Sequence, residues 1–148
     1  MPHPNPIPEG YHSIQPYLIF THASAAIDFY KQALGATEVL RMPRPDGRIG
    51  HAEIRIGDSV VMLADEHAEI GAFSPGHYGG SPISLLLYTA DCDALYSQAL
   101  ACGAESLREP ADQPYGDRMA GVLDPYGYKW YIATHIKDLT PEELAALK

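Results

Sequence analysis

The feature that most constrains the fold of this 148-residue chain is an order of elements that occurs twice. Each half has an apolar, β-branched run typical of a strand, then apolar residues at helical spacing that end at a glycine, then three short strands separated by turn residues. In the first half we expect strands at 14–20, 38–41, 50–56 and 59–64 and a helix at 23–34. In the second half we expect strands at 83–88, 105–107, 118–123 and 129–134 and a helix at 91–102.

The two halves align at an offset of 68 residues, with Ala26-Ile27 on Ala94-Leu95 and Gly35-Ala36 on Gly103-Ala104. Duplication of one module explains the equal spacing, and a chance succession of similar elements is the alternative. We expect an α+β chain whose modules join near Gly79-Gly80. The expected boundaries are module 1 at about 11–66, a linker at about 67–80 and module 2 at about 81–138.

Both ends of the chain are predicted to lie outside the modules. Residues 1–10 alternate proline with other residues, a pattern that excludes a helix and an inner strand and indicates an extended tail. Residues 139–148 are predicted to hold a short helix, because Thr140 is a good N-cap, Pro141 suits the first helical position, and Glu143 completes a capping box.

Composition excludes several classes of partner. The net charge of −9 argues against nucleic acid and against an anionic membrane surface, both of which need clustered Lys and Arg. No apolar run is long enough to span a bilayer. Cys92 and Cys102 lie about 15 Å apart along one predicted helix, too far for a disulfide. These features predict a soluble, reduced, cytoplasmic protein.

The alternation along residues 50–56 predicts which side chains face away from the helix. Ala52, Ile54 and Ile56 point one way and suit helix packing, whereas His51, Glu53 and Arg55 point the other way. That polar row has two interpretations: a solvated outer face with cross-strand pairs, or the lining of a concave cleft. Ten tyrosines favour the second, because phenols often line ligand pockets, although half-buried sheet positions explain most of them individually.

Several motifs in order resemble the superfamily of glyoxalases, bleomycin-resistance proteins and ring-cleaving dioxygenases, also called vicinal oxygen chelate proteins, and most of all its PhnB-like branch. The resemblance covers about residues 10–138. It is carried by residues 13–20, Ala26-Ile-Asp-Phe-Tyr30, Leu34-Gly-Ala36, Gly50-His-Ala-Glu53, Ile56-Gly-Asp-Ser59, Tyr115-Gly-Asp-Arg-Met119, Leu123-Asp-Pro-Tyr-Gly127 and Trp130 to His135.

The resemblance implies paired βαβββ modules, each forming half of a curved mixed sheet around a cleft, and a homodimer. Members of the superfamily include metal-dependent enzymes and metal-free proteins that sequester drugs, so the fold does not settle the function. The metal ligands of its enzymes correspond here to Gln15, Met62 (or Val61, if the register is shifted by one residue), Ser84 and Tyr131. Only Gln15 is a ligand of the family's type, and a hard divalent cation needs more carboxylate or imidazole than this set supplies. We predict no cofactor and no usual metal site.

Two functions follow as hypotheses. In the first, the protein captures an organic metabolite or drug in a cleft, and the arginines orient a polar group of the ligand. In the second, it is a lyase, isomerase or dioxygenase that uses a displaced metal around His51 and Glu53, or metal-free acid–base catalysis by the same two residues. The expected ligand-binding residues are Gln15, Tyr17, His51, Glu53, Arg55, Ser84, Tyr88, Arg118 and Tyr131.

Overall fold

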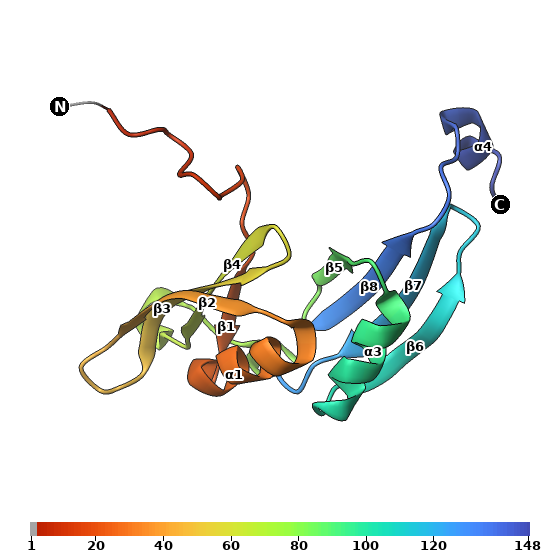
Figure 1. Ribbon diagram of the computed structural model, residues 1–148. Coiled ribbons are helices and arrows are strands. Elements are labelled where there is room, and N and C mark those ends of the chain that lie inside the picture. Colours follow the sequence, from red (N-terminus) through yellow and green to blue (C-terminus); the bar gives the residue numbers. More distant parts are fainter. Residues whose placement is uncertain (1–2) are drawn as a thin grey trace. The chain divides into compact units, whose positions relative to one another are not determined.

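The computed structural model describes residues 3–148 and divides into two compact units, one ending at Gly79 and the other beginning at Gly80. Each unit holds a four-stranded mixed sheet with a helix on it, which confirms the predicted α+β class and its duplicated module (Figure 1). Residues 3–10 of the expected tail form no helix or strand, and residues 1–2 lie outside the described residues. No described helix is long and apolar enough to cross a membrane.

The sheet of unit 1 has the order β1-β4-β3-β2, with β1 parallel to β4 and the other pairs antiparallel. Its first strand is shorter than predicted and starts at Tyr17, because Pro16 has no N–H and Ile14 is 85% exposed. The elements are β1 (Tyr17–Phe20), α1 (Ala23–Leu34), β2 (Thr37–Pro43), β3 (Ile49–Ile56) and β4 (Ser59–Asp65).

Helix α1 covers one face of this sheet because its apolar residues recur at helical spacing. It buries Ile27 and Tyr30 completely against sheet residues that include Phe20 and Ile54. The rings of Phe20 and Tyr30 meet edge to face. The helix ends at Gly35, whose φ of 69° is the left-handed conformation that glycine adopts without strain.

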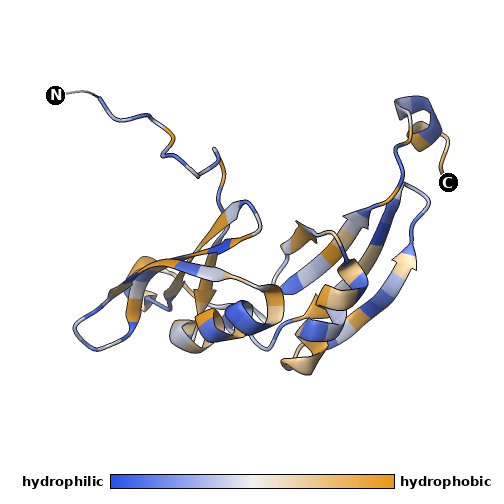
Figure 2. Ribbon diagram, viewed as in Figure 1, coloured by the Kyte–Doolittle hydropathy of each residue, from blue (hydrophilic) through white to orange (hydrophobic). Residues whose placement is uncertain are grey.

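Alternating hydrophobic and hydrophilic positions run along the strands of both sheets (Figure 2).

The first turn of α1 is capped from a distant strand. His22 precedes the helix and makes no side-chain cap, but the Asp65 carboxylate at the end of β4 accepts from the Ala23 backbone N–H at 2.8 Å. The same carboxylate accepts from Ile49 N–H at 2.7 Å, so one buried side chain joins α1, β3 and β4. These bonds satisfy N–H groups that a helix start and a strand start otherwise leave unpaired.

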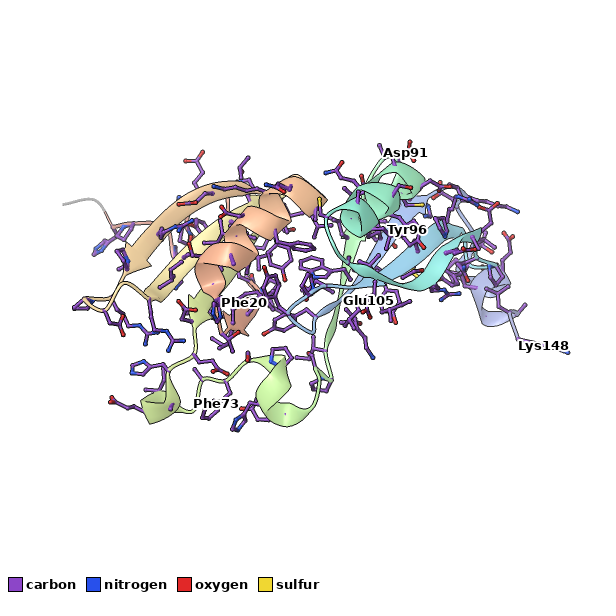
Figure 3. The ribbon with its side chains drawn as sticks, turned by 90° about the horizontal axis from the view of Figure 1, so that it is seen from below. Phe20, Phe73, Asp91, Tyr96, Glu105 and Lys148 are labelled. Atoms are coloured by element: carbon purple, nitrogen blue, oxygen red, sulfur yellow. The ribbon has the colours of Figure 1, made fainter. Side chains whose placement is uncertain are left out.

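Residues 67–79 of the expected linker are folded and belong to unit 1, whereas Gly80 begins unit 2. A bridge pairs His67 with Ala72 around the 3-10 helix η1 (Ala68–Ile70), and a short helix α2 (Pro75–Tyr78) follows. Phe73 lies between them and stacks on the His77 ring at a centroid distance of 3.8 Å (Figure 3).

The sheet of unit 2 repeats the topology in the order β5-β8-β7-β6. Strand β6 is longer than the predicted 105–107, because it lies at the edge of the sheet and a register shift between Arg108 and Ala111 accommodates Pro110. The hydroxyl of Tyr96 of α3 donates to Ser106 Oγ of β6 at 2.6 Å. The elements are β5 (Ser84–Tyr88), α3 (Cys92–Ala101), β6 (Glu105–Asp112), β7 (Asp117–Leu123), β8 (Lys129–His135) and α4 (Pro141–Ala145).

Side chains cap the N-termini of helices α3 and α4 in unit 2. The Asp91 side chain caps α3, and Thr134 Oγ1 of β8 accepts from Cys92 N–H at 2.9 Å, at a strand end that matches the place of Asp65 in unit 1. Helix α4 begins with the predicted capping box of Thr140 and Glu143. Both cysteines are free thiols, as expected from their spacing.

Candidate functional site

The sheet of unit 1 has a face that α1 does not cover, called here the polar face. The register pairs Tyr17 with Met62, Met62 with Glu53, and Glu53 with Leu40, so these four side chains lie in one row across the sheet. His51 and Arg55 flank Glu53 on β3. The predicted alternation is therefore confirmed, since Ala52, Ile54 and Ile56 are buried on the helix side.

A chain of hydrogen bonds crosses the polar face. The Tyr17 hydroxyl lies 2.7 Å from His51 Nδ1, and His51 Nε2 lies 2.7 Å from Glu53 Oε2. The Tyr11 hydroxyl donates to the other carboxylate oxygen, Glu53 Oε1. Glu53 is only 6% exposed, whereas Tyr17 is 48% exposed. The hydrogen bonds thus connect a buried carboxylate, through an imidazole, to a phenol at the surface. We call Tyr11, Tyr17, His51 and Glu53 together the Glu53 cluster.

The protonation states follow from the carboxylate. Burial raises the pKa of Glu53, but the hydrogen bonds from His51 and Tyr11 and the charge on His51 outweigh it and hold the pKa below its ordinary value. An ionised Glu53 only accepts, so His51 donates from Nε2. When the His51 ring carries a single proton, that proton is on Nε2, and Nδ1 accepts from the Tyr17 hydroxyl. The Tyr11 pKa is raised by its hydrogen bond to Glu53 and by burial, and the Tyr17 pKa is raised by burial and by the Glu53 charge.

Two other expected residues of unit 1 face the N-terminal segment instead. Gln15 Oε1 accepts from the His12 backbone N–H at 2.6 Å, and Arg55 Nη1 donates to the Gly10 carbonyl at 3.1 Å. Tyr11 was missed in the sequence because it follows the proline-rich tail and shares no periodicity with a strand.

The expected residues of unit 2 divide between the two faces of its sheet. Ser84, Tyr88 and Tyr131 lie on the face that α3 does not cover, according to the pairing of β5 and β7 with β8. The placement of Arg118 beside them is wrong. Arg118 pairs with Thr134 on the helix side and binds Asp93 of α3 at 2.7 Å, because it is an odd number of residues away from Gly121, the partner of Tyr131.

The two modules repeat the fold without repeating the chemistry. Glu53 lies opposite Met62 in unit 1, and the corresponding pair in unit 2 is Gly121 opposite Tyr131. A Cβ on Gly121 would lie 3.1 Å from carbons of the Tyr131 ring, which is a tight contact. The absence of a side chain at Gly121 therefore leaves room for that ring. The carboxylate cluster of unit 1 therefore has no counterpart at the equivalent place in unit 2.

Unit 2 has a different cluster at the end of its sheet. Asp117, only 5% exposed, accepts from the Tyr88 hydroxyl at Oδ2 over 2.8 Å and lies 2.8 Å from His135 Nδ1 at Oδ1. His135 Nε2 lies 2.7 Å from Asp138 Oδ1. The sequence placed Tyr88 among the expected ligand-binding residues, but Asp117 gave no signal because its register with β8 is a tertiary property.

The contacts of His135 with Asp117 and Asp138 predict that the stability of the protein depends on pH. Hydrogen bonds to Asp117 and Asp138 raise the pKa of His135, so its contribution to stability is complete below about pH 6.5, its ordinary pKa, and is lost as pH rises through the raised value. Asp117→Asn should lower the pKa of His135 towards the ordinary range, as measured by NMR titration of the imidazole Cε1–H. Asp112→Asn, on the far face, is the control, and an unchanged midpoint in Asp117→Asn would contradict the assignment.

The residues at the family's metal positions do not fit a divalent metal. The Gln15 oxygen already accepts a backbone N–H, Met62 offers a soft thioether, and the Tyr131 ring packs on Gly121. Within residues 3–148 no group of three or more His, Cys, Asp or Glu side chains is gathered as metal ligands would be. His51 and His135 have both ring nitrogens in hydrogen bonds.

Comparison with known proteins agrees with this fold. The model of the glyoxalase/bleomycin resistance protein/dioxygenase superfamily matches residues 12–132. An uncharacterised protein of Mycobacterium bovis is 35% identical over 137 residues, which are 90% of each chain. The crystal structure of TioX from Micromonospora sp. ML1 has a TM-score of 0.65 and 24% identity, covering 87% of this chain and 100% of that one.

A putative 3-demethylubiquinone-9 3-methyltransferase, the PhnB protein from Bacillus cereus, has a TM-score of 0.62 and 20% identity, covering 83% of this chain and 99% of that one. At these identities the solved structures show a common fold. The chain belongs to the glyoxalase/bleomycin resistance protein/dioxygenase superfamily, as the resemblance implied, and its structural neighbours include a PhnB protein.

Proposed function

We propose that this protein binds a small organic molecule on the polar face of unit 1 without a divalent metal. The observation that carries the proposal is the chain from buried Glu53 through His51 to exposed Tyr17. Its polar centre is flanked on β2 by Leu40, 36% exposed, and Met42, 59% exposed, which the register places opposite Glu53 and His51.

This arrangement suits a ligand that is mostly apolar with one polar group. Leu40, Met42 and the Tyr17 ring supply apolar surface, and burying it favours binding by roughly 25 cal/mol per Å². The exposed Tyr17 hydroxyl, which His51 orients, supplies a directional hydrogen bond that fixes the ligand's orientation. Membership of a superfamily that includes drug-binding proteins supports the proposal. The proposal includes a homodimer, which is supported by the apolar edge strand β5, where Leu86 is 50% exposed. It also includes a cytoplasmic location, which is supported by the two free thiols.

The test is a ligand screen by thermal denaturation in the presence of a chelator. A true ligand at about 100 times its Kd should stabilise the wild-type protein by about 2.7 kcal/mol. His51→Ala should weaken binding about tenfold, the equivalent of one hydrogen bond, and so shrink the shift. His67→Ala is the matched control, because the imidazole of His67 pairs with the exposed carboxylate of Glu69 and is not part of the Glu53 cluster.

Two results would contradict this proposal. The first is a broad screen in which no compound shifts the melting temperature. The second is stoichiometric Zn, Ni, Mn or Fe in protein purified without a chelator, lost in His51→Ala, which would establish a displaced metal site.

The same hydrogen-bond chain favours a second candidate, metal-free acid–base catalysis. An ionised Glu53 orients His51, and His51 Nδ1 is placed to take a proton from Tyr17 or, through it, from a bound carbonyl compound. Turnover that is lost in Glu53→Gln while ligand binding persists would favour this candidate over simple capture.

A further inference from the structure

The N-terminal segment is attached to the polar face through two contacts made far along the chain. The Tyr11 hydroxyl donates to Glu53 Oε1 across 42 residues, and the Gly10 carbonyl accepts from Arg55 Nη1 across 45 residues. A turn in which Tyr11 N–H donates to the Pro8 carbonyl precedes the contact. Residues 3–7, before this turn, form no helix or strand, so the proline-rich tail is anchored at its junction with the domain.

One carboxylate oxygen of Glu53 is hydrogen-bonded within the sheet, and the other is hydrogen-bonded to the N-terminal segment. Oε2 is bonded to His51 of the same strand, whereas Oε1 is bonded to Tyr11. A carboxylate that is 6% exposed and ionised needs a donor on each oxygen, because an unpaired buried acceptor is costly. Any molecule that takes the place of Tyr11 must therefore bring a donor of its own.

We propose that the phenol of Tyr11 is a tethered occupant of the ligand position, and that the polar face takes a neutral aromatic molecule with a hydroxyl donor, which displaces Tyr11 from Glu53 Oε1. This inference rests on the proposed binding function and names its ligand class. An ether or a carboxylate at the same position would place an acceptor against the carboxylate and is rejected. The tether lowers the apparent affinity, because each binding event must first release the Tyr11 hydrogen bond.

The test uses the side-chain analogue of tyrosine. Kd values for p-cresol and for its methyl ether, 4-methylanisole, are measured by NMR titration of backbone amides around His51 and Glu53. The proteins are the full-length wild type, Tyr11→Phe, and Tyr78→Phe, which removes an exposed hydroxyl of the same unit. We expect Tyr11→Phe to bind p-cresol about tenfold more tightly than the wild type and Tyr78→Phe to bind it equally. The methyl ether should bind at least about tenfold more weakly than p-cresol.

A second measurement needs no variant. In the wild-type protein, saturating p-cresol should move the ring signals of Tyr11 to the positions of a solvent-exposed tyrosine and expose residues 3–11 to proteolysis. Binding of p-cresol at His51 and Glu53 with unchanged Tyr11 signals, or with equal affinity in Tyr11→Phe, overturns this inference and leaves the proposed binding function intact. A face that neither p-cresol nor any screened compound perturbs overturns both.

Discussion

Replacing Asp124 with alanine is expected to lower the free energy of unfolding by about 3 kcal/mol or more, the largest effect we predict for one side chain. Asp124 is 3% exposed, and its Oδ1 accepts from the backbone N–H groups of Tyr126 and Tyr128 at 2.9 Å each. Its Oδ2 accepts from Trp130 Nε1, also at 2.9 Å. Alanine leaves three donors, two of them buried, without this acceptor and removes the bond that fixes the indole of a core tryptophan.

Chemical denaturation followed by Trp130 fluorescence measures this loss, since Trp130 is the one tryptophan of the chain. The matched control is Asp58→Ala, in the β3–β4 turn that corresponds to the β7–β8 turn of Asp124. Asp58 is exposed and accepts only from the neighbouring Ser59 hydroxyl, so its loss should cost less than about 0.5 kcal/mol. Equal effects of the two substitutions would show that the Asp124 network carries little stability.

Replacing Asp65 with alanine should destabilise the protein by about 2 kcal/mol, at the upper end for a helix cap. The carboxylate is 6% exposed and is the acceptor for Ala23 N–H and Ile49 N–H. His22, at the N-cap position, provides no side-chain bond that would compensate. The substitution therefore leaves the backbone N–H groups at the start of α1 and at the start of β3 without this acceptor.

Hydrogen exchange locates this effect better than a melting temperature does. Amides in the first turn of α1 and at Ile49 should exchange faster in Asp65→Ala, while those of unit 2 keep their wild-type protection. Asp28→Ala, an exposed position on α1, serves as the control. Uniform loss of protection across both units would show that Asp65 acts on global folding and has no special role as a local cap.

Local sequence patterns predicted most elements because their causes are local. The helix at 23–34 and the capping box of Thr140 and Glu143 follow from apolar spacing, a glycine stop and cap chemistry. The errors occur where position in the sheet decides. Strand β6 continues through Pro110 only because it is an edge strand with a register shift, and β1 starts late because Pro16 cannot donate.

The candidate site was predictable in part. Alternation along β3 placed His51 and Glu53 on one face, and Tyr17 was among the expected ligand-binding residues, so three members of the Glu53 cluster came from the sequence. Tyr11 did not, because its contact with Glu53 closes a loop of 42 residues that no local pattern records. Arg118 was assigned to the wrong face because alternation within a strand gives no information about its register against the next strand.

The duplicated strand–helix–strands order is what the sequence by itself determined about this protein, because side-chain periodicity and turn chemistry act over a few residues. The tertiary structure decided which groups meet across strands. It brought Asp65 to the start of α1, Tyr11 to the carboxylate of unit 1, and Gly121 beneath Tyr131. These contacts depend on register and chain closure, so the two modules share one fold while only the first places a buried carboxylate at the centre of its polar face.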